Sequence, residues 1–457
     1  MREPSYIEAF GMQREICLRA VHDDGGNPAR TPLEPTLAGF RLYGELSLPV
    51  LESTLDMVLE QLDVLRGRLR RLGDRFVFVT EAGGCGVPLV RADLRGCDPE
   101  RLPERLAGIL HHARGFVEDQ QNGPPGTILL VRVDDGEHLF CAFFDHALID
   151  QSSVLAIMRR IGQVYAHLVA GDEPAARDLV AGHQGFVPFA RAVEADTQAR
   201  ASAAEFWRPR VAGAERRVAM PHCAWRPWRE RDADRLISWD FAPDDLDAII
   251  RARRATGAPT MYLLLAAISV AVSGGSGADF IPVTYHRHGR AGAGLHPLGP
   301  LWETLVTYPP QRNPDRLGRW VAEFSSDNLD APSMGGLALV DFADLDTVME
   351  LRRFTLNVRL PRRAIPFGPV RTFPFDFNDV PPPRELAPRK YNTGIRINPQ
   401  PDGGLRVSLH HDPADLHDGA ALLAAAVTVV RMVADRPDLP LREACDESAA
   451  VLSRPVA

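Results

Sequence analysis

The stretch PVLESTLDMVLEQLDVLRGRLRRLGDRFVFV, residues 49–79, begins with apolar residues at helical spacing and ends with a short run typical of a strand. Apolar side chains first recur three or four residues apart, which predicts an amphipathic helix because such positions share one helical face. A Gly-Asp turn and a strand are expected to follow. The apolar positions of this helical face are Leu51, Leu55, Val58, Leu59, Leu62 and Leu65.

A second pattern predicts two strands and a helix around the middle of the first half. The runs TILLVRV (127–133) and HLFCAFF (138–144) are separated by DDG, which is typical of a hairpin turn. The second run is almost continuously apolar, as expected for a strand buried on both faces. Helical spacing resumes from residue 152, with Asp150 placed to cap the helix. The stretch FFDHALIDQSS (143–153) therefore lies between a strand and a helix.

Predicted strands and helices continue through the second half. At 457 residues, the chain is too long for one ordinary core. The segment GDEPAARDLVAGHQG (171–185) is small, polar and broken by Pro and Gly, so we interpret it as the linker between two lobes. We place the first lobe at residues 1–175 and the second at 176–457.

Composition excludes several classes of function. A net charge of −8 without a basic tract disfavours binding to nucleic acid or anionic lipid. The sequence lacks an apolar run long enough to span a membrane and the apolar core of a signal peptide, so we expect a cytoplasmic protein. Lys390 is the only lysine, which argues against Schiff-base and P-loop chemistry. The cysteines and histidines lack metal-ligand spacing, so we expect no metal.

The loop after the buried strand carries the candidate chemistry. A rigidly held histidine such as His146 is suited to act as a general base. The same HxxxD spacing is also typical of a strand-end histidine followed by a helix-capping aspartate, Asp150, and the motif alone favours that interpretation. The spacing alone leaves both interpretations open.

The surroundings of this loop resemble the condensation-domain superfamily, which includes nonribosomal peptide condensation domains and polyketide-associated acyltransferases. There, two strands lead to HHxxxDG, and a helix bearing a tyrosine follows. This chain resembles a free-standing member with DHxxxDQ, in which His146 matches the second, catalytic histidine and Tyr165 matches the tyrosine. LDVLRGRLRR (62–71) and LGPLWETLV (298–306) resemble further motifs of the superfamily, in the same order along the chain.

The resemblance implies an α/β fold of two chloramphenicol-acetyltransferase-like lobes in a V-shaped pseudodimer with a central tunnel. It also implies acyl transfer from a phosphopantetheine or CoA thioester to a hydroxyl or amine acceptor, without an acyl-enzyme intermediate and without a bound cofactor. The implied partners are an acyl or peptidyl carrier protein, or acyl-CoA, and a small-molecule acceptor. His146 would be the general base.

The resemblance further implies that Asp150 supports the loop by pairing with an arginine of the second lobe. Arg287 is the candidate and Arg290 the reserve. Two residues depart from the family motif. Asp145 replaces its first histidine, either as an acceptor for backbone amides or as a group acting on substrate. Gln151 replaces its glycine and would narrow or reline the tunnel.

Three residues of the second lobe are further candidates for lining the site. Glu303 stands where the family usually has asparagine, and Trp302 and Thr304 either donate hydrogen bonds to an oxyanion or pack as ordinary side chains. We interpret the chain as an acyltransferase in natural-product or lipid biosynthesis. The alternatives are a catalytically degenerate protein that binds a carrier-tethered intermediate or recruits a partner, and a repurposed cyclase.

Overall fold

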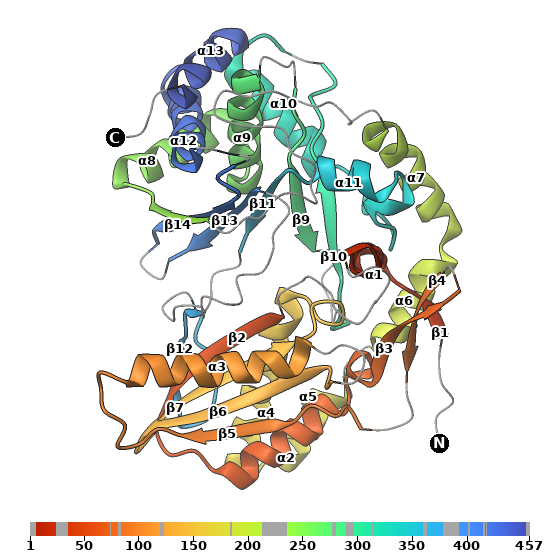
Figure 1. Ribbon diagram of the computed structural model, residues 1–457, viewed down its shortest axis with the longest axis vertical. Coiled ribbons are helices and arrows are strands. Elements are labelled where there is room, and N and C mark those ends of the chain that lie inside the picture. Colours follow the sequence, from red (N-terminus) through yellow and green to blue (C-terminus); the bar gives the residue numbers. More distant parts are fainter. Residues whose placement is uncertain are drawn as a thin grey trace.

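The chain folds into two α/β lobes joined along one side (Figure 1). A computed structural model describes the protein. The described residues are 6–23, 35–73, 75–80, 84–118, 123–182, 185–212, 235–276, 280–288, 297–312, 314–359, 363–377, 393–400, 403–414, 416 and 418–453.

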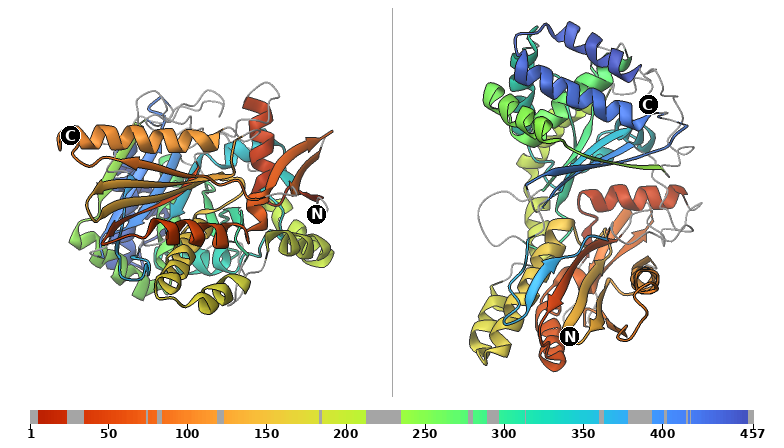
Figure 2. Two further views of the ribbon diagram at one scale, coloured as in Figure 1. Left: turned by 90° about the horizontal axis from the view of Figure 1, so that it is seen from below. Right: turned by 90° about the vertical axis from the view of Figure 1, so that its left-hand side faces the viewer.

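The first lobe is built on a five-stranded mixed sheet with helices on both faces. Its strands, in spatial order, are β12 (Arg371–Pro374), β2 (Thr36–Tyr43), β7 (Glu137–Phe144), β6 (Gly126–Asp134) and β5 (Leu89–Asp93). Its helices are α2 (Leu48–Leu59), α3 (Leu102–Glu118), α4 (Gln151–Val169), α5 (Glu173–Ala181) and α6 (Phe186–Ala195). In Figures 1 and 2, α3 covers one face of the sheet and α2 and α4 cover the other.

Strand β7 is buried on both faces, as its continuous apolar run predicts. Phe140, Ala142 and Phe144 belong to the core that contains α2 and α4. The alternate residues Leu139, Cys141 and Phe143 belong to the core under α3. Because successive side chains of a strand point to opposite faces, both cores depend on this one strand, and the loop that follows it starts from a rigid position.

The second lobe has a six-stranded sheet covered by helices on the side away from the first lobe. Its strands, in spatial order, are β10 (Trp302–Val306), β9 (Thr284–His288), β11 (Phe354–Val358), β13 (Thr393–Pro399), β14 (Leu405–His411) and β8 (Arg235–Asp240). Its helices are α7 (Thr197–Val211), α8 (Pro243–Thr256), α9 (Thr260–Ser276), α10 (Leu317–Leu329), α11 (Leu345–Leu351), α12 (Gly419–Asp435), α13 (Leu441–Leu452) and the short 3₁₀ helix η3 (Leu339–Asp341).

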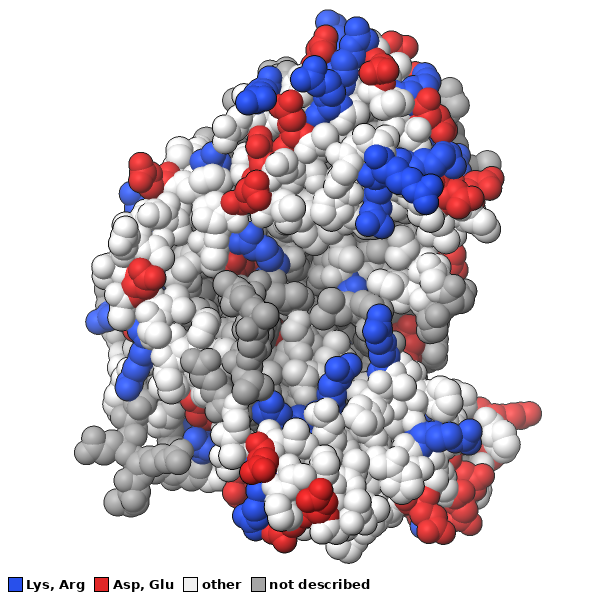
Figure 3. Space-filling view, turned by 180° about the vertical axis from the view of Figure 1, so that it is seen from behind, with Lys and Arg blue, Asp and Glu red and all other residues white. Residues whose placement is uncertain are grey.

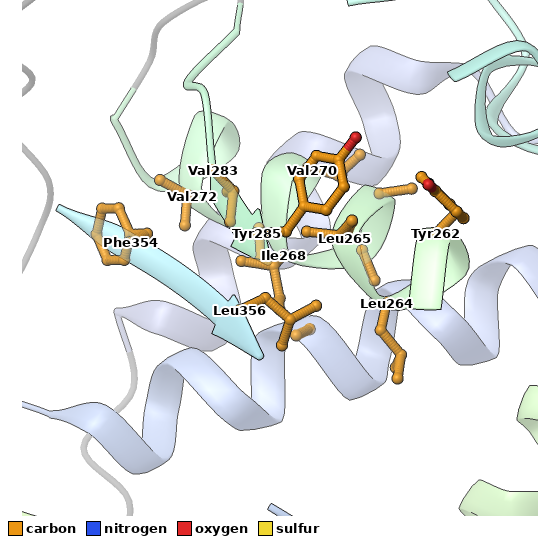
Figure 4. Close-up of a cluster of buried hydrophobic side chains, with 14 of the residues drawn as sticks. Tyr262, Leu264, Leu265, Ile268, Val270, Val272, Val283, Tyr285, Phe354 and Leu356 are labelled. Atoms are coloured by element: carbon orange, nitrogen blue, oxygen red, sulfur yellow. The ribbon is translucent and has the colours of Figure 1, made fainter. Parts of the chain in front are cut away.

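The core of the second lobe lies between its sheet and α9. Leu265 and Ile268 of α9 pack in the same cluster as Tyr285 of β9 and Leu356 of β11 (Figure 4). Tyr285 is fully buried, and its hydroxyl donates to the carbonyl oxygen of Asn328 at 3.1 Å. The face of β9 that carries Tyr285 is therefore the helix-covered face, and the residues before and after Tyr285 point toward the first lobe.

A small sheet and a helix lie at the junction of the lobes. The sheet comprises β1 (Tyr6–Glu8), β4 (Arg75–Thr80) and β3 (Gly67–Leu72), in that order. Helix α1 (Met12–Asp23) lies between the two lobes in Figure 1. Among the described residues, no single helix has the length and apolarity to cross a membrane, although α8 and α9, joined at a 98° bend, pass that test together.

The helix expected from residue 49 is shorter than its apolar pattern predicts. Helix α2 ends at Leu59, a 3₁₀ turn η1 (Asp63–Arg66) follows, and the chain then enters β3. Two tertiary contacts explain the early end. Asp63 accepts hydrogen bonds from the backbone N–H groups of Phe186 and Val187 at 2.8 and 2.9 Å. Gly67 lies against the ring of Phe78, which would overlap any side chain at that position.

The segment expected to be the linker is helical. Residues 173–181 form α5, whose Ala176 and Val180 pack in the core of the first lobe. The chain passes from the first lobe to the second after this segment, between α6 and α7. Helix α6 packs in the core of the first lobe, and Trp207 of α7 packs in the core of the second. Strand β12 then returns to the first sheet, where it pairs with β2. The division into residues 1–175 and 176–457 stays a prediction.

Candidate active site

The loop between β7 and α4 is held by hydrogen bonds along its whole length. The N–H of Asp145 donates to the carbonyl oxygen of Pro125 at 3.0 Å, and the N–H groups of Leu148 and Ile149 both donate to the carbonyl oxygen of Asp145 at 2.9 Å. Thr36 Oγ1 donates to the carbonyl oxygen of Ile149 at 2.9 Å. The loop is therefore a fixed turn whose backbone continues the order of the buried strand.

Asp150 joins this loop to the second half of the chain. It caps α4, since Oδ1 accepts from the N–H of Ser153 at 2.7 Å, and Oδ2 accepts from the N–H of Leu301 at 3.0 Å. Ser153 Oγ bonds the backbone of Gly299 at 3.0 Å. Asp150 is 2% exposed. A buried carboxylate with two backbone donors holds residues 299–301 against the start of α4.

Arg287 is engaged elsewhere, which corrects its expected pairing with Asp150. Its guanidinium lies 3.3 Å from Glu303 Oε2 and donates to the carbonyl oxygen of Ala331 at 2.7 Å. The reason is strand parity: Arg287 lies two residues after Tyr285, on the helix-covered face of the sheet. Arg290, the reserve candidate, lies outside the described residues. Among the described residues, Asp150 bonds the backbone of residues 299–301 instead of Arg287, and Leu301 packs in the core of the first lobe.

Glu303 is also on the helix-covered face of the sheet. It is the register partner of Arg287, and its Oε1 accepts from the N–H of Met334 at 2.8 Å and from Ser333 Oγ at 2.5 Å. Its exposed fraction is 8%. Because the carboxylate is directed toward residues 333 and 334, Glu303 braces the second lobe and does not line the face that carries its neighbours Trp302 and Thr304.

His146 faces the second lobe. It is half-buried, whereas the other residues of the 145–150 turn are buried. Its ring centroid lies 4.5 Å from that of Trp302, the first residue of β10. Trp302 Nε1 is buried without a hydrogen-bond partner among the described residues. The structure thus brings together one predicted residue from each lobe, an imidazole and an indole.

His286 is a site residue that sequence reasoning missed. Its ring centroid lies 5.3 Å from that of Trp302, and its Nδ1 lies 3.1 Å from Thr304 Oγ1. Thr304 and His286 are register partners on neighbouring antiparallel strands, so they share one face. The signal available in the sequence was the alternation that sets Trp302 and Thr304 on one face. The pairing with His286 required the sheet register.

Asp145 has a different environment from His146. It is 8% exposed, and its Oδ1 accepts from the N–H of Ala147 at 2.8 Å. Burial raises the pKa of its carboxyl to about 6, although the Ala147 hydrogen bond and the charge of Arg68 oppose the rise. The expected role as an acceptor for backbone amides is the one that this geometry supports.

Gln151 bonds the first strand of the lobe. Its Nε2 donates to the carbonyl oxygen of Leu37 in β2 at 3.1 Å, which links the first turn of α4 to the neighbouring strand. The side chain therefore occupies space beside the turn that a glycine would leave empty.

No group of three or more His, Cys, Asp or Glu side chains in the described part of the chain is arranged to hold a metal ion. Acidic and basic side chains are interspersed over both lobes on the face seen in Figure 3.

Comparison with known proteins identifies the family of this chain. The family model for the condensation domain matches residues 36–331, which is more than half of the chain. The chain belongs to the condensation-domain family. Condensation domains form amide or ester bonds and have two chloramphenicol-acetyltransferase-like lobes, so the expected family and two-lobed fold are confirmed. The central tunnel stays a prediction.

Curated relatives of this condensation domain are much longer proteins. The AMB antimetabolite synthetase AmbE of Pseudomonas aeruginosa is 29% identical over 198 residues, which are 43% of this chain and 9% of the relative. Malpinin synthetase of Mortierella alpina is 25% identical over 246 residues, which are 53% of this chain and 3% of the relative. The chain thus matches a small fraction of each synthetase.

Solved condensation domains share the fold along nearly the whole chain. The starter condensation domain of rhizomide synthetase, solved in complex with C8-CoA, has a TM-score of 0.70 and 17% identity, covering 96% of this chain and 97% of its own. The SgcC5 protein from Streptomyces globisporus has a TM-score of 0.68 and 18% identity, covering 95% and 100%. At these identities, the likeness concerns the fold.

Proposed function

We propose that this condensation domain is an acyltransferase that moves an acyl group from a carrier-protein or CoA thioester to a hydroxyl or amine acceptor, with His146 as the general base. The observation that carries the proposal is the position of His146. It is the half-buried residue of an otherwise buried turn, and it faces Trp302 of the other lobe at 4.5 Å. A base held between two lobes is suited to a reaction of two substrates.

The proposed reaction needs one proton transfer in each direction. Neutral His146 takes the proton of the acceptor hydroxyl as its oxygen bonds to the thioester carbon. The carbonyl oxygen then carries the negative charge of a tetrahedral intermediate. When the carbon–sulfur bond breaks, the thiolate leaves and receives the proton from the His146 imidazolium. The products are an ester, or an amide from an amine, and a free thiol.

Trp302 is the candidate for stabilising the tetrahedral oxyanion. Its Nε1 is a donor, and it is buried without a partner among the described residues. A buried donor without an acceptor raises the free energy of the protein, and a substrate oxygen that accepts its hydrogen bond offsets that increase. A donor directed at the developing negative charge also lowers the reaction barrier. Thr304 and His286, on the same face, supply further polar groups around this position.

Two observations support a thioester donor. The family acts on substrates tethered to carrier proteins or linked to CoA, and the rhizomide synthetase domain was solved with C8-CoA.

Ester formation is our preferred outcome, because Asp145 and Gln151 replace the first histidine and the glycine of the peptide-forming motif.

Purified protein incubated with acyl-CoA or acyl-carrier thioesters and candidate hydroxyl and amine acceptors tests the proposal. Mass spectrometry should detect acylated product with the wild type and at least a 100-fold slower reaction with His146→Ala, on the scale of a lost general base. His167→Ala, on the exposed end of α4, is the matched control and should retain full activity. Equal rates with His146→Ala would remove His146 from the chemistry. Tight carrier binding without product from any donor would favour the degenerate binding protein.

A further inference from the structure

Gln13 of α1 contacts the turn that carries His146. Its Nε2 donates to the carbonyl oxygen of Ala147 at 2.8 Å, and its Oε1 accepts from the N–H of Phe10 at 2.9 Å. Gln13 is fully buried and Ala147 is 1% exposed. Both polar atoms of the Gln13 amide therefore form hydrogen bonds, and the amide nitrogen donates to the residue that follows His146 in the chain.

Helix α1 is anchored to the second lobe by the neighbours of Gln13. Arg14 pairs with Asp341 of η3, and Glu15 pairs with Arg352, the residue that follows α11. The N–H of Gly11 donates to the carbonyl oxygen of Gly336 at 2.7 Å. The Glu15–Arg352 pair is almost completely shielded from solvent, since its side chains are 0% and 7% exposed. Breaking one side of such a pair is costly, so α1 is firmly attached to the second lobe.

The Gln13 bond adds a different support from those of the first lobe. Pro125 and Thr36 bond the two ends of the turn, and Asp150 bonds residues 299–301. The Ala147 carbonyl lies between these supports in the chain, and it accepts the hydrogen bond from Gln13. Rotation of the peptide that joins Ala147 to Leu148 would change the path of the chain beside the His146 imidazole. The Gln13 donor opposes that rotation.

We propose that Gln13 is a positioning residue for His146, and that through it α1 sets the orientation of the catalytic imidazole from the second lobe. The inference rests on the proposed function of His146. Because acyl transfer requires a near-attack geometry between base, acceptor and thioester, a displacement of the imidazole by even 1 Å lowers the rate by up to about 100-fold. Loss of the Gln13 donor should lower kcat and leave the KM of either substrate within a factor of two.

Two substitutions separate the donor from the packing of the side chain. Gln13→Leu fills similar space without polar atoms, and we expect kcat to fall at least 10-fold at every pH. Gln13→Glu keeps the acceptor for the Phe10 N–H and donates to Ala147 only while its carboxyl is protonated. Burial raises the pKa of such a carboxyl. The Glu variant should therefore approach wild-type kcat at acidic pH and lose it as the pH rises, relative to wild type.

Asn328 provides the matched control. It is another fully buried amide that donates to backbone carbonyls, those of Tyr308 at 3.0 Å and Phe324 at 2.9 Å, but it lies in α10 of the second lobe. Asn328→Leu should lower the melting temperature as Gln13→Leu does, with kcat per folded molecule unchanged. An equal kcat loss in both variants would show that Gln13 acts through stability alone and would overturn the proposal.

A second measurement is independent of turnover. In protein labelled at histidine Cε1, the resonance assigned to His146 by its loss in His146→Ala should shift in Gln13→Leu and stay in place in Asn328→Leu. If wild-type protein acylates no acceptor, the proposed function fails, but this shift still decides the positioning role. An unshifted His146 resonance together with an unchanged kcat would overturn it.

Discussion

The imidazole of His146 and the indole of Trp302 lie with ring centroids 4.5 Å apart, although His146 follows a strand of the first sheet and Trp302 begins a strand of the second. Neither lobe alone contains the pair. Asp150 maintains the relationship, because it bonds both the start of α4 and Leu301, the residue before Trp302. The relative position of base and indole therefore depends on a carboxylate between them in the fold.

Replacing Trp302 by Phe tests the indole donor. The aromatic contact with His146 is kept and Nε1 is removed, so we expect kcat to fall about 100-fold, as for loss of one oxyanion donor, with little change in KM. Trp320→Phe, a buried tryptophan of α10 stacked on Phe324, is the control and should leave kcat unaltered. A Trp302→Phe enzyme with wild-type kcat would assign Trp302 to packing.

Removing the Asp150 carboxylate should destabilise the protein more than removing an ordinary helix cap. Asp150→Ala loses the α4 cap and leaves the buried N–H of Leu301 without its acceptor, for a total of about 2 to 4 kcal/mol. Asp172→Ala removes the exposed cap of α5 and should cost about 1 kcal/mol. Urea unfolding of both variants measures the difference. Equal losses would mean that the Leu301 bond contributes nothing.

The buried Asp145 carboxyl should make stability fall as the pH rises through its folded pKa. Burial raises that pKa from 3.8 to about 6, so the folded state binds the proton more tightly than the unfolded state does. The free energy of unfolding then decreases between about pH 4 and pH 6, by on the order of 3 kcal/mol in total. Asp145→Asn keeps an acceptor for the Ala147 N–H and removes the titration.

Denaturant unfolding of wild type and Asp145→Asn at several pH values checks this dependence. The variant should gain stability relative to wild type as the pH rises from 4 to 6.5. A difference that is constant over this range would show that the carboxyl titrates alike in both states.

Replacing Gln151 by Gly should lower the stability of the protein and ease the entry of bulky acyl substrates. The variant loses the hydrogen bond to the Leu37 carbonyl and gains backbone freedom in the first turn of α4, at a cost of about 1 to 2 kcal/mol. Space beside the turn opens, so the KM for bulky acyl thioesters should fall. Gln151→Ala, which loses the hydrogen bond but not the backbone restriction, is the intermediate control. A higher KM in Gln151→Gly would instead make the Gln151 amide a substrate contact.

The local structure around His146 was predictable because its signals are local. The apolar run of β7 and the cap at Asp150 are read within a few residues, and the structure contains both. Arg287 was the wrong candidate for pairing with Asp150, for a physical reason. Arg287 shares a strand face with the buried Tyr285, and tertiary packing decides that the helices cover this face, which local patterns do not specify.

Gln13 shows the limit of sequence reasoning at longer range. Its contact with Ala147 joins residues 134 positions apart, and nothing in the segment GMQRE marks the glutamine as part of the site. The end of α2 was missed for a related reason. Asp63 bonds the backbone of Phe186, and Gly67 packs against the ring of Phe78. These tertiary contacts override the helical period of the apolar residues.

Strand β12, an edge strand of the first sheet, comes from a late part of the sequence. Residues 371–374 pair with residues 40–43, so β2 gains its second neighbour only after more than three quarters of the chain is present. During synthesis from the N-terminus, the nascent first lobe would expose an open strand edge that can recruit another chain. Pairings so distant in sequence also slow folding. The two halves are thus interleaved, and separate expression of residues 1–175 would produce a sheet that lacks its closing strand.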